Sequence, residues 1–199
     1  QMLAGLGHTI VPPVPSLFTF NIKDPVLDGL SGTSFPYAEI RIPSLKRQES
    51  GPLLITHWGL SGPAVLKISA WEARTLAELE YRVDIEVNFI GKIRYEAEAL
   101  FMEYRQNHPK KTIGQSRIFE IDPGKSISSI SSTELKSILT LLCEKIFHVR
   151  GKSTFKDEFV TAGGVELKEI NFKTMASKKL PNFYIAGEVL NIDAVTGGF

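Results

Sequence analysis

The chain has 199 residues, of which 43% are hydrophobic and 23% charged, the composition of a globular protein with one or two domains. Its formal net charge is +1, with basic and acidic residues mixed along the sequence, so composition predicts no nucleic-acid partner. There is no apolar run near the ~20 residues that span a bilayer, and one cysteine, Cys143, excludes an internal disulfide framework, so we expect no membrane contact and a cytoplasmic location.

The first predicted element is the end of a helix at residues 1–7, with Gly7 as its C-cap. A stiff extended connector follows at residues 10–15, where three prolines in four positions can neither continue a helix nor sit in a central strand. At the other terminus the sequence stops where a helix should begin. Both termini are therefore predicted to be cuts through a larger fold.

Alternating apolar residues predict strands over residues 17–22, 37–42 and 81–89, and a continuous apolar run predicts a more buried strand over residues 53–56. The strand over residues 81–89 is the most regular, because Tyr81, Val83, Ile85, Val87 and Phe89 alternate with polar residues, which indicates one face in water. Several such strands separated by turns favour a small barrel or a sandwich over a parallel sheet.

Two stretches then change to the helical period. Residues 93–104 place their apolar side chains on one face. Ser131 and Glu134 form a capping box ahead of a second helix. The side chains that this second helix is expected to bury are Leu135, Ile138, Leu139, Leu142 and Ile146. A helical insert is thus predicted between β segments, which resume at residues 155–161.

The segment Gly59–Ala64 allows three interpretations. A hydrolase nucleophile elbow would need glycine at position 63, which is Pro63, so that motif fails. Alternatively, Ser61 or Gly62 caps a helix with Pro63 in its first turn. In the third, that helix start and His57 line a ligand cavity. His57 is the only residue that we single out as a candidate catalytic acid or base.

Metal ligation is not predicted, because His8, His57, His108 and His148 are scattered and form no ligand motif. The C-terminal stretch is different. A buried strand at residues 183–186 runs into Gly187-Glu188, an acidic loop with Asp193 follows, and Thr196-Gly197-Gly198 comes last. A carboxylate can accept hydrogen bonds from sugar hydroxyls, and glycines allow backbone to approach a flat cofactor. A sheet with glycine-rich turns is the simpler alternative.

These segments resemble a known family. The matching stretches are residues 7–17, 56–64, 160–165, 173–178, 183–193 and 196–199. Together they are similar to the aminoacetone-oxidase-like group of NAD(P)/FAD-dependent oxidoreductases. The family's N-terminal Gly-x-Gly-x-x-Gly motif is absent from this sequence.

The resemblance implies an α+β fold, with a small translation-factor-like β-barrel, an inserted helical subdomain and flanking pieces of a glutathione-reductase-type FAD-binding domain. The implied division is residues 1–16 (end of the FAD domain), 17–92 (barrel), 93–150 (helical insert), 151–163 (last barrel strand) and 164–199 (returning FAD segment). The implied cofactor contacts are Gly163, Gly164, Gly187, Glu188, Asp193, Thr196, Gly197 and Gly198.

The sequence hypothesis is therefore a fragment of an FAD-dependent oxidoreductase, an insert with flanks that covers the flavin and shapes a pocket for a small-molecule substrate. Alone, the fragment is expected to be inactive and not to retain FAD, because its partners would be the missing N- and C-terminal parts of the FAD domain. The alternative is a non-catalytic binding or interaction module built on the barrel.

Overall fold

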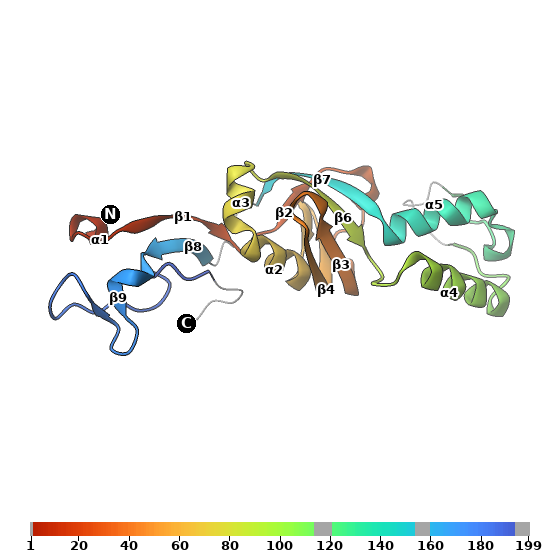
Figure 1. Ribbon diagram of the computed structural model, residues 1–199. Coiled ribbons are helices and arrows are strands. Elements are labelled where there is room, and N and C mark those ends of the chain that lie inside the picture. Colours follow the sequence, from red (N-terminus) through yellow and green to blue (C-terminus); the bar gives the residue numbers. More distant parts are fainter. Residues whose placement is uncertain (1, 114–120, 154–159, 194–199) are drawn as a thin grey trace.

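The computed structural model describes residues 2–113, 121–153 and 160–193. The molecule is elongated, with three parts in a row (Figure 1). A closed barrel occupies the middle, a pair of helices extends from one end, and a ribbon with irregular loops extends from the other. No helix within the described residues is long and apolar enough to cross a membrane.

The barrel is closed by six antiparallel strands in the order β2-β5-β4-β3-β6-β7. The strands are β2 (Phe20–Ile22), β3 (Ser34–Ile42), β4 (Arg47–Thr56), β5 (Gly59–Ser61), β6 (Arg82–Asn88) and β7 (Lys145–Lys152). The prediction of an α+β protein with a small β-barrel and helices is confirmed at this level.

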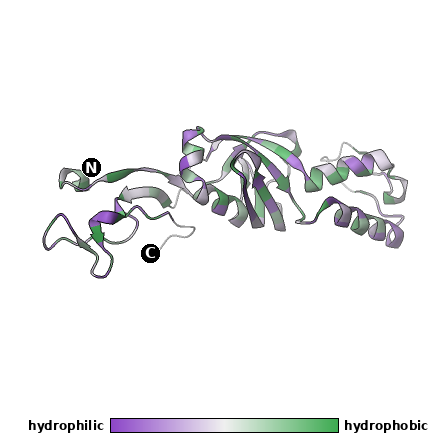
Figure 2. Ribbon diagram, in the orientation of Figure 1, coloured by the Kyte–Doolittle hydropathy of each residue, from purple (hydrophilic) through white to green (hydrophobic). Residues whose placement is uncertain are grey.

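Alternation along the strands builds the barrel core, and hydrophobic and hydrophilic residues alternate along them in Figure 2. On β6, Val83, Ile85 and Val87 are buried while Arg82 and Asp84 are exposed, as predicted. Strand β2 is shorter than predicted and begins only at Phe20. Leu17, where the strand was predicted to begin, has a left-handed φ of 54°, which is incompatible with an extended strand.

Helices α2 (Pro63–Trp71) and α3 (Ala73–Glu78) follow the barrel's β5 strand. Gly62 is the N-cap of α2, with φ of 95°, and Pro63 occupies the first helical turn. Ser61 makes no capping bond; its hydroxyl instead accepts a hydrogen bond from Thr19 at 3.0 Å. Helix α2 adds Ala64, Val65 and Ile68 to the barrel core.

The helical pair consists of α4 (Arg94–Asn107) and α5 (Ser132–Cys143) and lies between β6 and β7 in the chain. A short helix, η4 (Ile127–Ser129), comes just before α5. The capping box predicted at Ser131 and Glu134 is present. Helix α5 ends at Cys143, earlier than predicted, and Ile146 is 55% exposed on β7. Phe147 and Val149 alternate with exposed neighbours there, so the strand pattern prevails over the helical one.

The third part contains the short helix α1 (Met2–Gly5) and the ribbon of β1 (Ile10–Ser16) with β8 (Val160–Val165). The proline run was expected to be a connector, but it pairs as a strand. Both strands of this ribbon are edges, and the register shifts between Val11 and Val14, so the missing proline N–H groups are tolerated. The helix η5 (Leu167–Glu169) and the small strands β9 (Ile170–Asn171) and β10 (Ala176–Ser177) follow.

The pairing also shows which strand closes the barrel. Strand β7 bonds to both β6 and β2, whereas β8 bonds to β1 outside the barrel. The division of the chain into five domain segments stays a prediction, as does the assignment of the two flanks to an FAD-binding domain.

Candidate functional site

A cleft of about 750 Å³ opens at one end of the barrel. It is bounded by β2, the loop over residues 23–31, the turn between β4 and β5, and Arg150 on β7. This volume falls within the range of small-molecule sites in proteins. His57, the candidate chosen from the sequence, lines this cleft beside Trp58.

The turn that carries His57 and Trp58 is held tightly against β2. The Thr56 hydroxyl donates to the Gly59 carbonyl at 3.2 Å and accepts from the Trp58 N–H at 3.3 Å. Ile22 N–H donates to the Trp58 carbonyl at 2.9 Å. Gly59 has φ of 145°, and a Cβ there would overlap the Phe20 carbonyl oxygen. The backbone is thus fixed, while Trp58 keeps 54% of its surface exposed.

The polar groups of the cleft differ in how they are satisfied. Both carboxylate oxygens of Asp24 have partners: the Lys145 ammonium lies 2.9 Å from one, and the Val26 N–H donates to the other at 2.9 Å. Lys23 and Arg150 are exposed and form no ion pair with any residue that the structure describes. Asn21 donates to the Lys152 carbonyl at 2.8 Å, but its buried Oδ1 has no donor among the described residues.

A second hollow, of about 370 Å³, brings together three residues predicted to contact FAD: Gly163, Gly164 and Glu188. The glycines serve the chain's own packing. A Cβ at Gly163 would lie 2.7 Å from the Pro12 carbonyl oxygen, and one at Gly164 would overlap that of Val189. The Glu188 side chain is exposed and forms no ion pair or hydrogen bond within the described residues.

The other predicted cofactor residues are not gathered at this hollow. Gly187, with φ of 82°, accepts the Leu190 N–H at 3.1 Å and shapes a turn. Asp193 lies 3.1 Å from Arg74 on α3, which also donates to Asn191 at 2.7 Å. Thr196, Gly197 and Gly198 lie outside the described residues.

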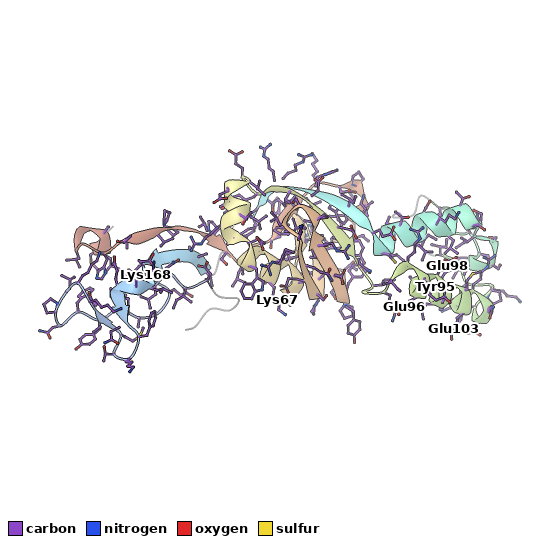
Figure 3. The ribbon with its side chains drawn as sticks, viewed as in Figure 1. Lys67, Tyr95, Glu96, Glu98, Glu103 and Lys168 are labelled. Atoms are coloured by element: carbon purple, nitrogen blue, oxygen red, sulfur yellow. The ribbon has the colours of Figure 1, made fainter. Side chains whose placement is uncertain are left out.

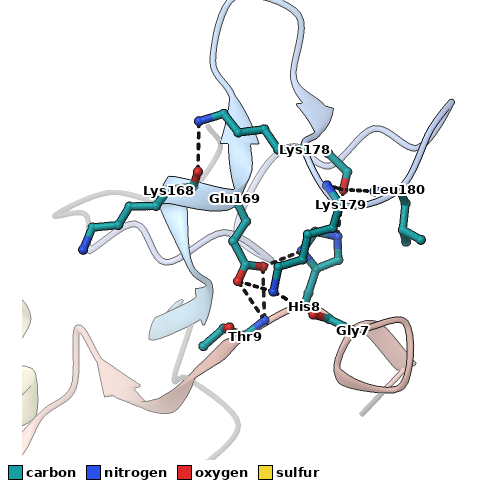
Figure 4. Close-up of polar contacts among 9 residues, drawn as sticks. Gly7, His8, Thr9, Lys168, Glu169, Lys178, Lys179 and Leu180 are labelled. Carbon is teal, nitrogen blue, oxygen red and sulfur yellow. Dashed lines mark hydrogen bonds and ion pairs between the residues drawn. The ribbon is translucent and has the colours of Figure 1, made fainter.

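Sequence reasoning missed a polar network centred on His8, which is only 4% exposed (Figure 4). His8 Nδ1 lies 2.7 Å from Glu169 Oε2, and Nε2 lies 3.1 Å from the Ser177 hydroxyl. That hydroxyl accepts from the N–H groups of Lys179 and Leu180, at 3.0 Å each. The serine proton is therefore left to donate to Nε2, and Nδ1 carries the proton given to Glu169.

Glu169 also binds Lys179, at 2.6 Å, and the Thr9 N–H, at 3.1 Å. Hydrogen bonding by Lys179, and then by Thr9 and His8, lowers the pKa of Glu169 to about 2. The network connects the start of β1 to the segment after β8 and so has a structural role. His8 and Glu169 are 161 positions apart in the sequence, so no local pattern could have indicated their contact.

Two further features were considered as possible sites: the single cysteine, Cys143, and groups of side chains that could bind a metal ion. Cys143 is 4% exposed within the apolar cluster of α4 and α5, and burial raises the pKa of its thiol. The described residues contain no group of three or more His, Cys, Asp or Glu side chains placed to hold a metal ion.

A family model described as the HI0933-like protein barrel and H2TH domain matches residues 14–160. The chain belongs to this family. The match covers the whole barrel and the helical pair, and it includes both His57 and Trp58.

Three curated relatives align with nearly all of the chain. The ribosomal RNA dihydrouridine synthase of Haemophilus influenzae is 31% identical over 100% of this chain and 51% of its own length. The enzyme of the same name from Escherichia coli K12 is 26% identical over 97% and 50%. The 3-dehydro-bile acid delta(4,6)-reductase of Clostridium scindens is 23% identical over 98% and 51%. The chain thus spans about half the length of these relatives.

Two predictions are corrected by these relatives. The hypothesis of an inactive insert fragment from an FAD-dependent oxidoreductase is wrong, because the similarity to ribosomal RNA dihydrouridine synthases runs through the whole chain. The prediction that nucleic acid is not a partner is overturned by the same two relatives, which are named for ribosomal RNA. That prediction used net charge, which averages out local charge. The alternative of a non-catalytic module matches none of the three names.

Proposed function

We propose that the full gene product reduces the carbon–carbon double bond of a uridine in ribosomal RNA. The observation that carries this proposal is the alignment of nearly the whole chain, at 26% and 31% identity, with two ribosomal RNA dihydrouridine synthases. Dihydrouridine is uridine in which the C5–C6 double bond of the uracil ring has become a single bond.

The third relative supports the same class of chemistry. A 3-dehydro-bile acid with double bonds at positions 4 and 6 is a conjugated ketone, and uracil C5=C6 is likewise conjugated to the C4 carbonyl. Both bonds can be reduced by adding hydride to the carbon remote from the carbonyl and a proton to the carbon beside it. For uracil, hydride forms the new C6–H bond, the π electrons move toward O4, and a proton then forms C5–H.

FAD is the cofactor proposed for this reaction, and in its reduced form it would supply the hydride. The proposed contacts are Gly163, Gly164, Gly187, Glu188, Asp193, Thr196, Gly197 and Gly198. Of the described members, Glu188 fits best, because its exposed carboxylate borders the hollow and is not used by another side chain. Gly163 and Gly164 would act indirectly, by allowing β1 and the 189–190 segment to close around that hollow.

The barrel-end cleft is the proposed site for the target nucleotide. Its volume of about 750 Å³ accommodates a base, and Trp58, which is 54% exposed, is an aromatic side chain in the cleft against which a base can stack. His57 is the proposed proton donor to C5, because it is an exposed imidazole on the rigid turn beside Trp58. Cys143 is unsuited to this role, since its thiol is buried between helices.

The test is direct. The full gene product is incubated with NADPH or NADH, added FAD and an unmodified ribosomal RNA transcript, and dihydrouridine is measured by nucleoside mass spectrometry. A conjugated 3-oxo steroid is assayed in parallel. We expect dihydrouridine in the RNA. Reduction of the steroid with no dihydrouridine in any ribosomal transcript would assign the protein to small-molecule chemistry instead.

Variants then test the site. His57→Gln should lower the rate of dihydrouridine formation by about 10²- to 10⁴-fold, the usual contribution of a general acid, with RNA binding unchanged. His148→Gln is the matched control, because His148 is an exposed barrel histidine that pairs with Asp84 outside the cleft. Equal rates for His57→Gln and the wild type would remove His57 from the mechanism.

A further inference from the structure

One cross-strand pair of the barrel, called here the Arg82–Arg150 rung, consists of two residues with the same charge. In the antiparallel register of β6 and β7, Arg82 lies directly opposite Arg150, and both side chains are exposed. Neither forms an ion pair or side-chain hydrogen bond with any residue that the structure describes. Like charges at directly opposed positions destabilise a sheet, so this rung costs stability and gains nothing within the described chain.

The neighbouring positions on the same face have side-chain partners. Asp84 lies opposite His148, and their side chains are 2.6 Å apart. Glu86, two positions further along β6, lies 3.3 Å from Arg41 on β3. The arginines that have no partner among the described residues therefore lie at one end of the β6–β7 pairing.

That end of the ladder adjoins the barrel-end cleft. Arg150 lines the cleft together with Trp58 and Lys23. Lys152 follows Arg150 on the same strand, with its ammonium 5.5 Å from the centre of the Tyr81 ring. Asp28 is the one cleft carboxylate that has no cationic partner among the described residues, since Lys145 neutralises Asp24. The surface around the cleft is thus net positive.

Helix α4 carries no such excess of positive charge, because its two arginines are matched by three glutamates. Glu96, Glu98 and Glu103 lie on α4 beside Tyr95, with their side chains exposed (Figure 3). A polyanion that approached the molecule would therefore be attracted to the Arg82–Arg150 end of the barrel rather than to α4.

We infer that Arg82 and Arg150 bind the phosphate backbone of the ribosomal RNA segment whose target nucleotide enters the cleft at Trp58. This inference rests on the proposed function. A guanidinium binds a phosphate with two parallel hydrogen bonds, so each of the two arginines can hold one phosphate of the strand. Phosphate contacts of this kind set register, while the aromatic face receives the base.

The experiment compares RNA binding by the full gene product and by its Arg82→Gln/Arg150→Gln variant. A fluorescent single-stranded fragment of the ribosomal RNA that carries the target uridine is titrated at several salt concentrations. We expect the variant to bind at least about tenfold more weakly, with the slope of log affinity against log salt reduced by about 1.4, or about 0.7 for each lost phosphate contact.

Three controls make the result specific. Arg41→Gln changes an exposed barrel arginine already paired with Glu39 and Glu86, and should leave RNA binding unchanged. Trp58→Leu should weaken binding about tenfold without changing the salt slope, because stacking releases no counterions. Thermal unfolding of the double variant should occur at or above the wild-type temperature, since the repulsive rung is removed.

The outcomes separate the two proposals. Wild-type dihydrouridine formation together with unchanged RNA affinity in the double variant would overturn the phosphate contact and leave the proposed function intact. A wild-type protein that neither binds nor reduces ribosomal RNA would overturn both. Equal competition by polyglutamate at matched charge would show a surface for acidic protein instead, and would also overturn the RNA contact.

Discussion

His8 Nδ1 lies 2.7 Å from Glu169 Oε2, and this contact joins two parts of the chain that are 161 residues apart. The imidazole is almost fully enclosed, and both of its nitrogens have partners. The ribbon of β1 and β8 has only two strands, which is a marginal unit without further packing. The His8 network therefore fixes the loops after β8 to the start of β1, and with them the hollow that Glu188 borders.

The first prediction concerns this buried histidine. His8→Ala should lower the free energy of unfolding by about 1–3 kcal/mol, because it removes two hydrogen bonds and the packing of a buried ring. Chemical denaturation measures the change. His148→Ala is the matched control: that histidine also pairs with a carboxylate, that of Asp84 at 2.6 Å, but the two side chains are 58% and 66% exposed. The control should cost less than about 1 kcal/mol. Equal losses in the two variants would contradict a special role for burial.

The second prediction concerns acid stability. The pKa of Glu169 is lowered from 4.5 to about 2 in the folded chain. A depressed pKa means that the unfolded chain binds the proton more readily, so the stabilisation is complete above pH 4.5 and is lost as the pH falls toward 2. Glu169→Gln should therefore flatten the stability curve over that range. Glu188→Gln, at an exposed carboxylate outside any ion pair of the described residues, should retain the wild-type acid limb.

The barrel could be predicted from sequence because its signals are local. Val83, Ile85 and Val87 alternate with polar residues, and the capping box at Ser131 indicates where α5 begins. The strand β7 was missed, since the apolar residues up to Ile146 also fit a helix; the signal was present in the alternation of Phe147 and Val149. Where alternation and helical period overlap, only tertiary pairing decides between them.

The candidate site was predictable only in part. His57 was singled out by its place before Gly59 and Pro63, and it does line a cleft. The Arg82–Arg150 rung and the His8 network depend on register and on distant contacts, which a single sequence does not contain. The glycines at 163 and 164 were assigned to a cofactor, but their nearest neighbours are the backbones of Pro12 and Val189.

The third prediction tests the turn that presents His57 and Trp58. Gly59→Ala should destabilise the barrel by more than about 1 kcal/mol, because alanine is strained at a φ of 145° and its Cβ would overlap the Phe20 carbonyl. Gly124→Ala is the control, as the nearest atom there is an aspartate oxygen at 3.5 Å and φ is not positive. Thermal unfolding followed by circular dichroism compares the two. A Gly59→Ala variant as stable as Gly124→Ala would mean that β5 can shift away from β2.

The fourth prediction concerns the start of α5. The Ser131 hydroxyl accepts from the Glu134 N–H at 3.3 Å, and Glu134 accepts from the Ser131 N–H at 2.8 Å. Ser131→Ala should remove about 1 kcal/mol of stability, the usual cost of losing an N-cap. The loss should appear as faster amide hydrogen exchange in the first turn of α5, with β6 and β7 unaffected.

Ser132→Ala provides the matched control for this change. Ser132 is the first residue of α5, is exposed, and makes no side-chain hydrogen bond with a described residue. Alanine is also the better helix former, so this variant should be as stable as the wild type or slightly more stable. If the two alanine variants behaved alike, the capping box would not be what fixes the start of α5, and Lys125, 2.6 Å from Glu134, would be the next residue to test.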